Sequence, residues 1–157
     1  MREMNSGLRG VGGLLALLVL SLMLIGPVNR IVATAREFDR SKSEVSILDE
    51  DPRWDRYAQV SWLITVICAS LSFAAGYRLW KIHRRNSVHF AILALWIMMP
   101  VASVLQSLSA LAIYGSEEAS TMLLAMLKAS LLSTLIAGLW TGYLMLSERV
   151  QNTYLDD

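Results

Sequence analysis

Two polar side chains, Gln106 and Lys128, stand inside long apolar segments, where an amide or a charge is costly unless it has a partner. Residues of this kind within membrane helices can line a path for an ion or a substrate. Both are equally distant in sequence from Glu117, so two antiparallel helices would place them at similar depth and in contact. The long stem of Lys128 could instead carry its ammonium to Glu117, Glu118 or lipid headgroups. A pathway and a purely structural role both remain open.

Small residues form a second pattern, because helices in lipid associate chiefly through close van der Waals contact. Gly138 and Gly142 have the Gly-x-x-x-Gly spacing, which lets two helix backbones approach but is also frequent by chance in apolar sequence. Their partner could be a helix of the same chain or of another protein. We expect helix packing at Gly10, Gly12, Gly13, Ala69, Ala75, Gly76, Gly138 and Gly142.

A cluster of basic residues separates two long apolar runs and forms a short hinge between them. Lys and Arg accumulate in short cytoplasmic loops of membrane proteins, so this hinge is predicted on the cytoplasmic face. Cations in a loop at the membrane surface also attract anionic lipid headgroups. The predicted headgroup contacts are Arg78, Lys81, Arg84 and Arg85.

The sequence shows no apparatus for catalysis. It has no phosphate-binding glycine loop, no nucleophile elbow and no pair of carboxylates within an apolar run. The one cysteine, Cys68, has no metal or redox motif around it, and His83 and His89 do not share a helical face. A net charge of +1 argues against nucleic-acid binding. We therefore expect no enzyme activity, no catalytic residues, no cofactor and no metal.

The elements that must position these residues are membrane helices. Of the 157 residues, 55% are hydrophobic and only 17% are charged, and the mean hydropathy is +0.47. These values are typical of a small multi-pass membrane protein. The sequence predicts an all-α, integral membrane four-helix bundle. The expected spans are 11–28, 58–80, 88–113 and 121–146, and Pro100 should kink the third.

The first apolar run has a competing interpretation, since Ala33-Thr34-Ala35 resembles the cleavage site of a secretory signal peptide. We favour a retained helix, because Asn29 and Arg30 interrupt the approach to that site. The segment 29–57 mixes six basic with seven acidic residues, which predicts a long solvated loop. It would have a short helical start, because Ile31, Val32, Ala35 and Phe38 recur near helical spacing and could lie along the membrane surface. That loop would be periplasmic, with both termini in the cytoplasm. Its six basic residues oppose this orientation, and the basic hinge and the Arg residues before the first span favour it.

Both ends of the chain resemble a known family. The opening Gly7-Leu8-Arg9-Gly10-Val11-Gly12-Gly13-Leu14, the following Leu24-Ile25-Gly26-Pro27 and the ending Ser147-Glu148-Arg149-Val150-Gln151-Asn152-Thr153-Tyr154 are similar to the terminal signatures of the bacterial membrane family called domain of unknown function 2569. The chain has Gly142 where that family often has proline. The resemblance implies a four-helix protein of the bacterial inner membrane, and it brings no catalytic residues with it.

The tail 147–157 contains the most specific of these motifs, and we expect a protein contact there through Arg149 and Asn152. The alternative is a plain helix end, in which Arg149 complements the helix dipole and Asn152 helps to end the helix.

The resulting functional hypothesis is a non-catalytic accessory or assembly subunit of the bacterial inner membrane. Its partners would be the lipid bilayer and either a larger membrane protein or further copies of the chain. The alternative is a small oligomeric transporter or channel that uses Gln106 and Lys128.

Overall fold

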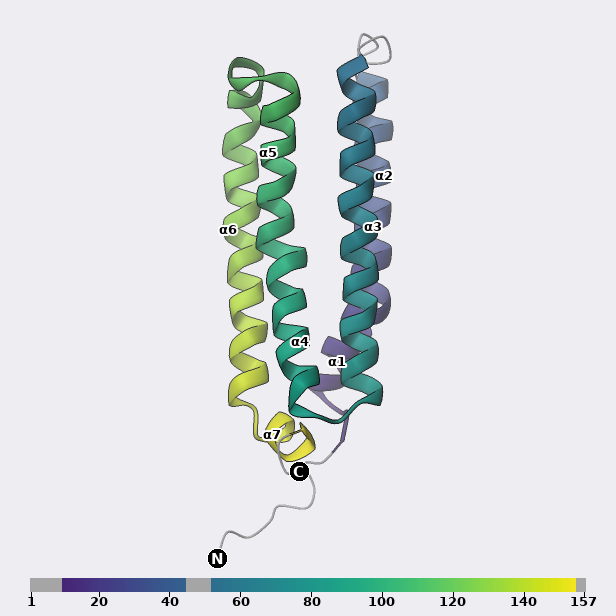
Figure 1. Cartoon of the computed structure of the whole chain (residues 1–157), viewed down its shortest axis with the longest axis vertical. Helices are drawn as coiled ribbons and strands as arrows, with labels where there is room; N and C mark the ends of the chain where they lie inside the picture. The colour runs from purple at the N-terminus through teal and green to yellow at the C-terminus, as the bar shows by residue number, and fades with distance from the viewer. Residues whose placement is uncertain (1–9, 45–51, 155–157) are drawn as a thin grey trace, which may run out of the picture.

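The chain forms an all-α bundle of long, roughly antiparallel rods (Figure 1). The computed structural model describes residues 10–44 and 52–154, the side chains of 41–44 and 116–126 excepted. In chain order the elements are α1 (Leu14–Leu20), the π-helical turn η1 (Ser21–Ile25), α2 (Gly26–Glu44), α3 (Pro52–Lys81), α4 (Arg85–Trp96), the π-helical turn η3 (Ile97–Val101), α5 (Ala102–Tyr114), α6 (Ser116–Leu146) and α7 (Glu148–Tyr154).

Four rods result, because η1 joins α1 to α2 and η3 joins α4 to α5 without a break in the helix. Each rod contains a helix that is long and apolar enough to cross a membrane, over Leu14–Arg40, Pro52–Lys81, Arg85–Tyr114 and Leu127–Leu146. The 30 residues of α3 extend about 45 Å, more than the hydrocarbon thickness of about 30 Å. The expected all-α class with four apolar helices is therefore confirmed.

The loop expected over 29–57 requires correction. The first rod continues beyond residue 28 as α2 to Glu44, and α3 already begins at Pro52. Pro27 is accommodated because it is the second residue of α2, just after the π-helical turn η1 and Gly26, where the regular ladder of hydrogen bonds is already interrupted. Arg30 is accommodated because its side chain turns inward to a backbone carbonyl of the third rod.

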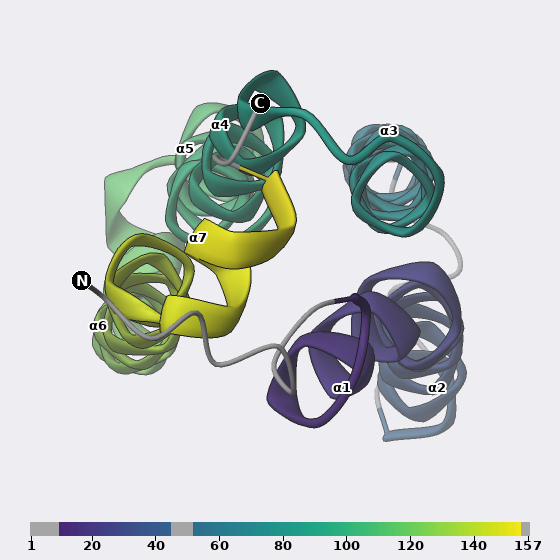
Figure 2. The same cartoon turned by 90° about the horizontal axis from the view of Figure 1, so that it is seen from below.

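The most deeply buried side chains lie toward the end of the bundle that carries the hinge 82–84. The short helix α7 crosses this end beside α6 and α4, as the view from below shows (Figure 2). Six fully buried apolar residues come from five different elements: Leu15, Leu18, Leu79, Leu95, Leu144 and Val150 lie in α1, α3, α4, α6 and α7. The outer side of α6, in contrast, exposes Leu131, Leu135 and Leu139, as expected of a surface in contact with lipid.

The two ends of the described chain meet at this hinge end. The Gly10 amide donates to Thr153 Oγ1 at 3.1 Å. The buried Tyr154 hydroxyl donates to the Leu79 carbonyl at the end of α3. The Tyr154 ring also stacks on His83 in the hinge, with 5.6 Å between the ring centroids. The first and last parts of the fold are thus held on the same side of the bundle as the basic hinge.

Candidate functional site

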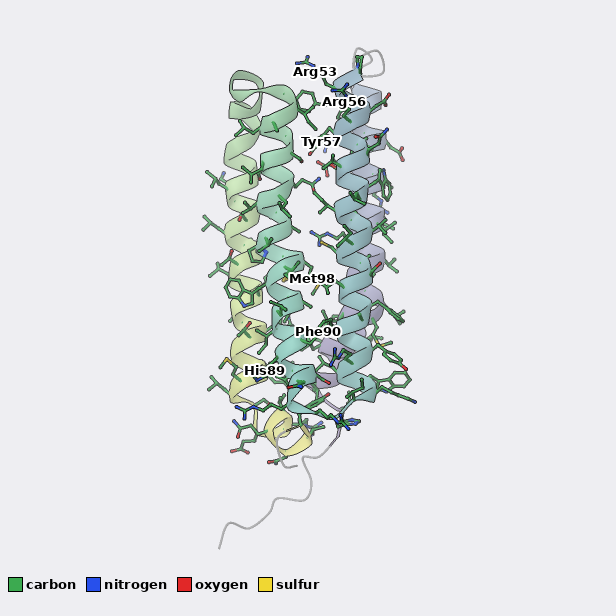
Figure 3. The ribbon with its side chains drawn as sticks, viewed as in Figure 1. Arg53, Arg56, Tyr57, His89, Phe90 and Met98 are labelled. Atoms are coloured by element: carbon green, nitrogen blue, oxygen red, sulfur yellow. The ribbon has the colours of Figure 1, made fainter. Side chains whose placement is uncertain are left out.

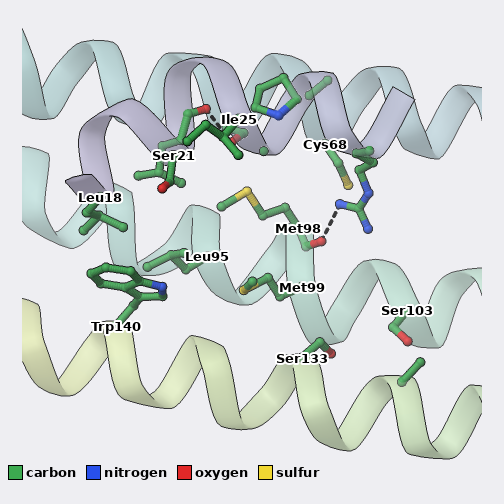
Figure 4. Close-up of a pocket in the computed structure, with 17 residues that line it drawn as sticks. Leu18, Ser21, Ile25, Cys68, Leu95, Met98, Met99, Ser103, Ser133 and Trp140 are labelled. Atoms are coloured by element: carbon green, nitrogen blue, oxygen red, sulfur yellow. Dashed lines mark hydrogen bonds between the residues drawn. The ribbon is translucent and has the colours of Figure 1, made fainter. Parts of the chain in front are cut away.

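A cavity of about 440 Å³ lies inside the bundle, between its four rods (Figure 4). Every rod contributes to its wall, and the lining combines apolar side chains with serines and one cation. The residues that matter most for its chemistry are Arg30 from α2, Cys68 and Ser72 from α3, Met98 from η3, and Ser133 and Trp140 from α6. Its volume lies within the range of small-molecule binding sites.

Arg30 is the one charged residue in the described lining of this cavity. Its Nη1 donates to the Met98 carbonyl at 2.5 Å, which links the first rod to the third; Figure 4 marks this bond with the dashed line at Met98. A guanidinium has five N–H donors, so this bond leaves most of its donor capacity unused. Since no Asp or Glu is among the described lining residues, the charge has no carboxylate beside it in the cavity.

The two π-helical turns lie in the first and third rods, and each leaves one carbonyl outside the regular ladder of hydrogen bonds. In η1 the Gly26 amide donates to the Ser21 carbonyl, five residues back, and not to the Leu22 carbonyl that would accept this bond in an α-helix. In η3 the Ala102 amide donates to Ile97 and Met99 and passes over the Met98 carbonyl. Such single π-helical turns within α-helices are frequent at functional sites.

Each of these two carbonyls accepts a hydrogen bond from a side chain of a neighbouring rod. Ser72 Oγ donates to the Leu22 carbonyl at 2.7 Å, and Arg30 donates to the Met98 carbonyl. Pro27 lies two residues after the end of η1 and Pro100 lies within η3, so each turn is located near a proline, which cannot donate a backbone hydrogen bond. The irregular backbone is therefore satisfied from within the protein and frames two walls of the cavity.

Arg30 lies near the middle of the first rod, 16 residues after Leu14 and 14 before Glu44. Its partner Met98 lies at mid-height in the third rod (Figure 3). An arginine at the centre of a membrane helix costs about 2.5 to 3.5 kcal/mol on insertion scales, and residues of this kind usually mark a functional site. Sequence reasoning missed Arg30, because it assigned the residue to a solvated loop. The helical spacing of Ile31, Ala35 and Phe38 predicted only a short helical start of that loop, whereas the structure continues the first rod through them as α2.

The predicted contact between Gln106 and Lys128 is not formed. Gln106 Nε2 donates to Ser61 Oγ on α3 at 3.1 Å, while Lys128 is exposed on α6. Neither residue is among the described residues that line the cavity. The Glu117 and Glu118 side chains, which Lys128 was expected to approach, lie outside the described part of the structure.

The four basic residues of the hinge end fall into two groups. Arg78 is half-buried, and its guanidinium carbon lies 4.7 Å from the centre of the Phe90 ring, so it takes part in the packing of α3 on α4. Lys81, Arg84 and Arg85 are exposed, and Lys81 lies over the Trp80 ring. These three residues are the ones whose cations are free to reach a headgroup.

The predicted packing residues also divide. Gly76 is tightly packed, because a Cβ there would lie 2.5 Å from Met23 Cγ and 3.1 Å from the Met23 backbone nitrogen. Ala75 beside it is fully buried, and Ala69 lies in the cavity wall. A Cβ added to Gly138 or Gly142 would meet nothing within 4 Å, so these two glycines have no packing partner in the described structure.

The two candidate residues of the tail, Arg149 and Asn152, lie in α7. Residues 155–157 of the tail lie outside the described residues. Arg149 is half-buried and its guanidinium lies against the Cα positions of Gly12 and Gly13. Asn152 is also half-buried. The opening and ending signatures that suggested a family are thus in contact with each other, through Arg149 on Gly12 and Gly13 and through the bond from Gly10 to Thr153. This internal packing gives Arg149 a role that needs no second protein.

The end of the bundle opposite the hinge carries an aromatic cluster. Phe38 of α2 packs edge-on against Trp54 of α3, with ring centroids 5.4 Å apart, and Tyr57 contacts Tyr114 of α5. Arg53 lies 5.7 Å from the centre of the Tyr114 ring, and Figure 3 labels Arg53 and Tyr57 near this end. Aromatic rings and arginines together are typical of a membrane–water interface. Among the described residues, no group of His, Cys, Asp and Glu is arranged to hold a metal.

A family model described as "Protein of unknown function (DUF2569)" matches residues 8–155, nearly the whole chain. This match confirms the resemblance in the terminal signatures. No curated protein and no solved structure matches the chain. The chain belongs to the DUF2569 family.

Proposed function

We propose that this protein is a non-catalytic, multi-pass accessory or assembly subunit of the bacterial inner membrane. It would pack against a helix of a larger membrane complex through the outer side of α6. The observation that carries the proposal is the open surface at Gly138 and Gly142, where an added Cβ would meet nothing within 4 Å. A backbone without side chains offers a second helix close van der Waals contact, which is the main attraction between helices in lipid.

The surroundings of these glycines support the same interpretation. Leu131 and Leu135 flank them on the same side of the helix and are 65% and 66% exposed. Exposed leucines in line with two glycines form one apolar surface along the helix, which suits an apolar helix of a partner.

The test is affinity purification in a mild detergent, followed by mass spectrometry of the proteins recovered. Gly138→Leu with Gly142→Leu should abolish recovery of the partner, because the added side chains fill the contact surface. Leu132→Phe is the matched control, since it adds bulk to an exposed position of the same helix about a third of a turn away. Equal recovery of the same partner with all three forms would refute the proposal.

The orientation is part of the proposal. Lys81, Arg84 and Arg85 at the hinge end favour a cytoplasmic location for that end. Gly10 and Tyr154 lie at the same end, so both ends of the described chain would face the cytoplasm.

A small transporter is the second candidate, and the cavity around Arg30 is the observation that favours it. The pathway would then use Arg30 rather than Gln106 and Lys128, since these two residues do not meet. Oligomeric state separates the candidates. A symmetric homo-oligomer whose axis is polar would favour transport, and copurification of larger membrane subunits would favour the accessory role.

A further inference from the structure

We infer that the cavity around Arg30 binds an amphiphilic oxyanion, an alkyl chain with a carboxylate or phosphate head, which reaches the cavity from the lipid between α2 and α6. This inference rests on the cavity alone and does not depend on the accessory role.

The first step concerns the charge of the ligand. Arg30 uses one N–H on the Met98 carbonyl, and its remaining donors can hold an oxyanion in the two-pronged geometry that guanidinium groups favour. On its own helix the nearest described carboxylate is that of Glu37, about two turns away toward the far end of α2. A ligand with an anionic head would therefore supply the counter-charge that the described lining lacks.

The second step concerns the rest of the ligand. Leu18, Leu22 and Ile25 of the first rod face Leu95 and Met99 of the third across the cavity, so most of its wall is apolar. A small hydrated anion would lose its water against such walls without compensation. An alkyl chain on the anion would bury apolar surface there, while the Arg30 guanidinium holds the head.

The third step concerns access from the membrane. In the described structure α2 packs on α3, α3 packs on α4 and α5, and α5 packs on α6, but α2 and α6 have no comparable contact. Figure 2 shows these two helices on the same side of the bundle. The cavity is lined on this side by Pro27 of α2 and by Ala129 and Ser133 of α6. Ala129 is exposed, so the cavity opens toward the surface that lipid would cover.

Cys68 provides a direct measure of occupancy, because it lies in the cavity wall and is the only cysteine of the chain. The full-length protein in dodecyl maltoside would be treated with N-ethylmaleimide, and the alkylation rate of Cys68 followed by intact mass. Oleate or oleyl phosphate should slow alkylation about tenfold at a concentration near ten times its Kd. The thermal unfolding midpoint, read from tryptophan fluorescence, should rise with the same ligand.

The other probes decide which part of the inference holds. Protection by oleate alone, or by oleyl phosphate alone, supports it and identifies the head as carboxylate or phosphate. Oleyl alcohol, acetate and inorganic phosphate should not protect. Equal protection by oleyl alcohol would show that the charge is irrelevant, and equal protection by acetate or inorganic phosphate would show that the alkyl chain is. Either result, or a failure of both amphiphiles to protect or stabilise the protein, would overturn the inference.

Three variants link the effect to the cavity. Arg30→Met should lose protection by the anionic amphiphile, whereas Arg36→Met should keep it, because Arg36 is exposed on the same helix and absent from the described lining. Ala129→Trp leaves the Arg30 guanidinium intact and blocks the opening between α2 and α6, so it should also lose protection. If Arg30→Met fails to fold, Ala129→Trp still decides the question. Protection that survives in Ala129→Trp would contradict access from the lipid.

Discussion

The Arg149 guanidinium lies directly over Gly12, so close that a Cβ at Gly12 would overlap its Nη1. Gly12 precedes α1, and Arg149 is the second residue of α7, so this contact joins the first part of the fold to the last. It also explains in physical terms why glycines and an arginine occur in the two terminal signatures. A long side chain can lie flat on a backbone only where that backbone carries no Cβ.

The packing of α3 on η1 predicts a large difference between two glycines. Gly76→Ala should destabilise the protein by about 1 to 3 kcal/mol, because its Cβ would overlap Met23 Cγ and press on the Met23 backbone. Gly138→Ala is the control, since its Cβ meets nothing within 4 Å and the change should be neutral or slightly stabilising. The thermal unfolding midpoint in detergent measures both. Equal midpoints for the two variants would contradict the close approach of α3 to η1.

The hydrogen bond from Ser72 to the Leu22 carbonyl predicts a modest loss of stability for Ser72→Ala. The variant leaves a buried carbonyl of η1 without this partner, and we expect a cost of about 1 kcal/mol. Ser70→Ala on the same helix makes the same chemical change at an exposed position and should have little effect. Hydrogen exchange of the amides around η1 should increase only in Ser72→Ala. An unchanged exchange rate there would contradict the role assigned to Ser72.

Tyr154 predicts a dependence of stability on alkaline pH. Burial, with a smaller contribution from Tyr143, raises the pKa of the Tyr154 phenol from 10.0 to about 12. Below pH 10 the phenol is protonated in both states, so the contribution of its hydrogen bond to Leu79 is complete. Between pH 10 and 12 the unfolded chain releases the proton while the folded protein retains it, so stability should fall.

Tyr154→Phe tests this expectation. It removes the hydroxyl that donates to Leu79, so it should be less stable than the wild type at neutral pH and should lose part of the decline above pH 10. Tyr77→Phe, at an exposed position of α3, is the matched control. Chemical denaturation at pH 8, 10 and 11.5 gives the comparison. Parallel pH profiles for the wild type and Tyr154→Phe would contradict the assignment.

The proposed orientation predicts opposite labelling at the two ends of the bundle. In a Cys68→Ala background, Asn86→Cys lies exposed beside the hinge and Asp55→Cys lies exposed near the opposite end of α3. A membrane-impermeant maleimide should label Asp55→Cys in spheroplasts and should label Asn86→Cys only after the membrane is opened. The reverse pattern would place the hinge outside and refute the orientation.

The four apolar helices were predictable because lipid demands long runs without charge, and hydropathy records such runs directly. Gly76 was also predictable, since small residues permit close approach of helices. Which small residues would find a partner was not, because the spacing of Gly138 and Gly142 on their own helix does not reveal what lies opposite them.

Arg30 was missed for a more specific reason. Arg30 stands next to a segment of mixed acidic and basic residues, so by sequence it resembles a loop residue. The carbonyl that accepts its hydrogen bond belongs to Met98 in the third rod, which is distant in sequence. The two π-helical turns were equally hidden. Pro100 indicated an irregularity in the third rod, but the pairing of each released carbonyl with Ser72 or Arg30 depends on how the rods pack.

The bond between Gly10 and Thr153 joins residues 143 positions apart. During synthesis all four rods must therefore be translated before α7 can pack against the first residues of the fold. Until α7 is synthesised, the growing polypeptide lacks the hydrogen bond from Tyr154 to the Leu79 carbonyl and the packing of α7 at the hinge end. Completion of the fold is consequently a late event of biogenesis, which follows insertion of the last rod.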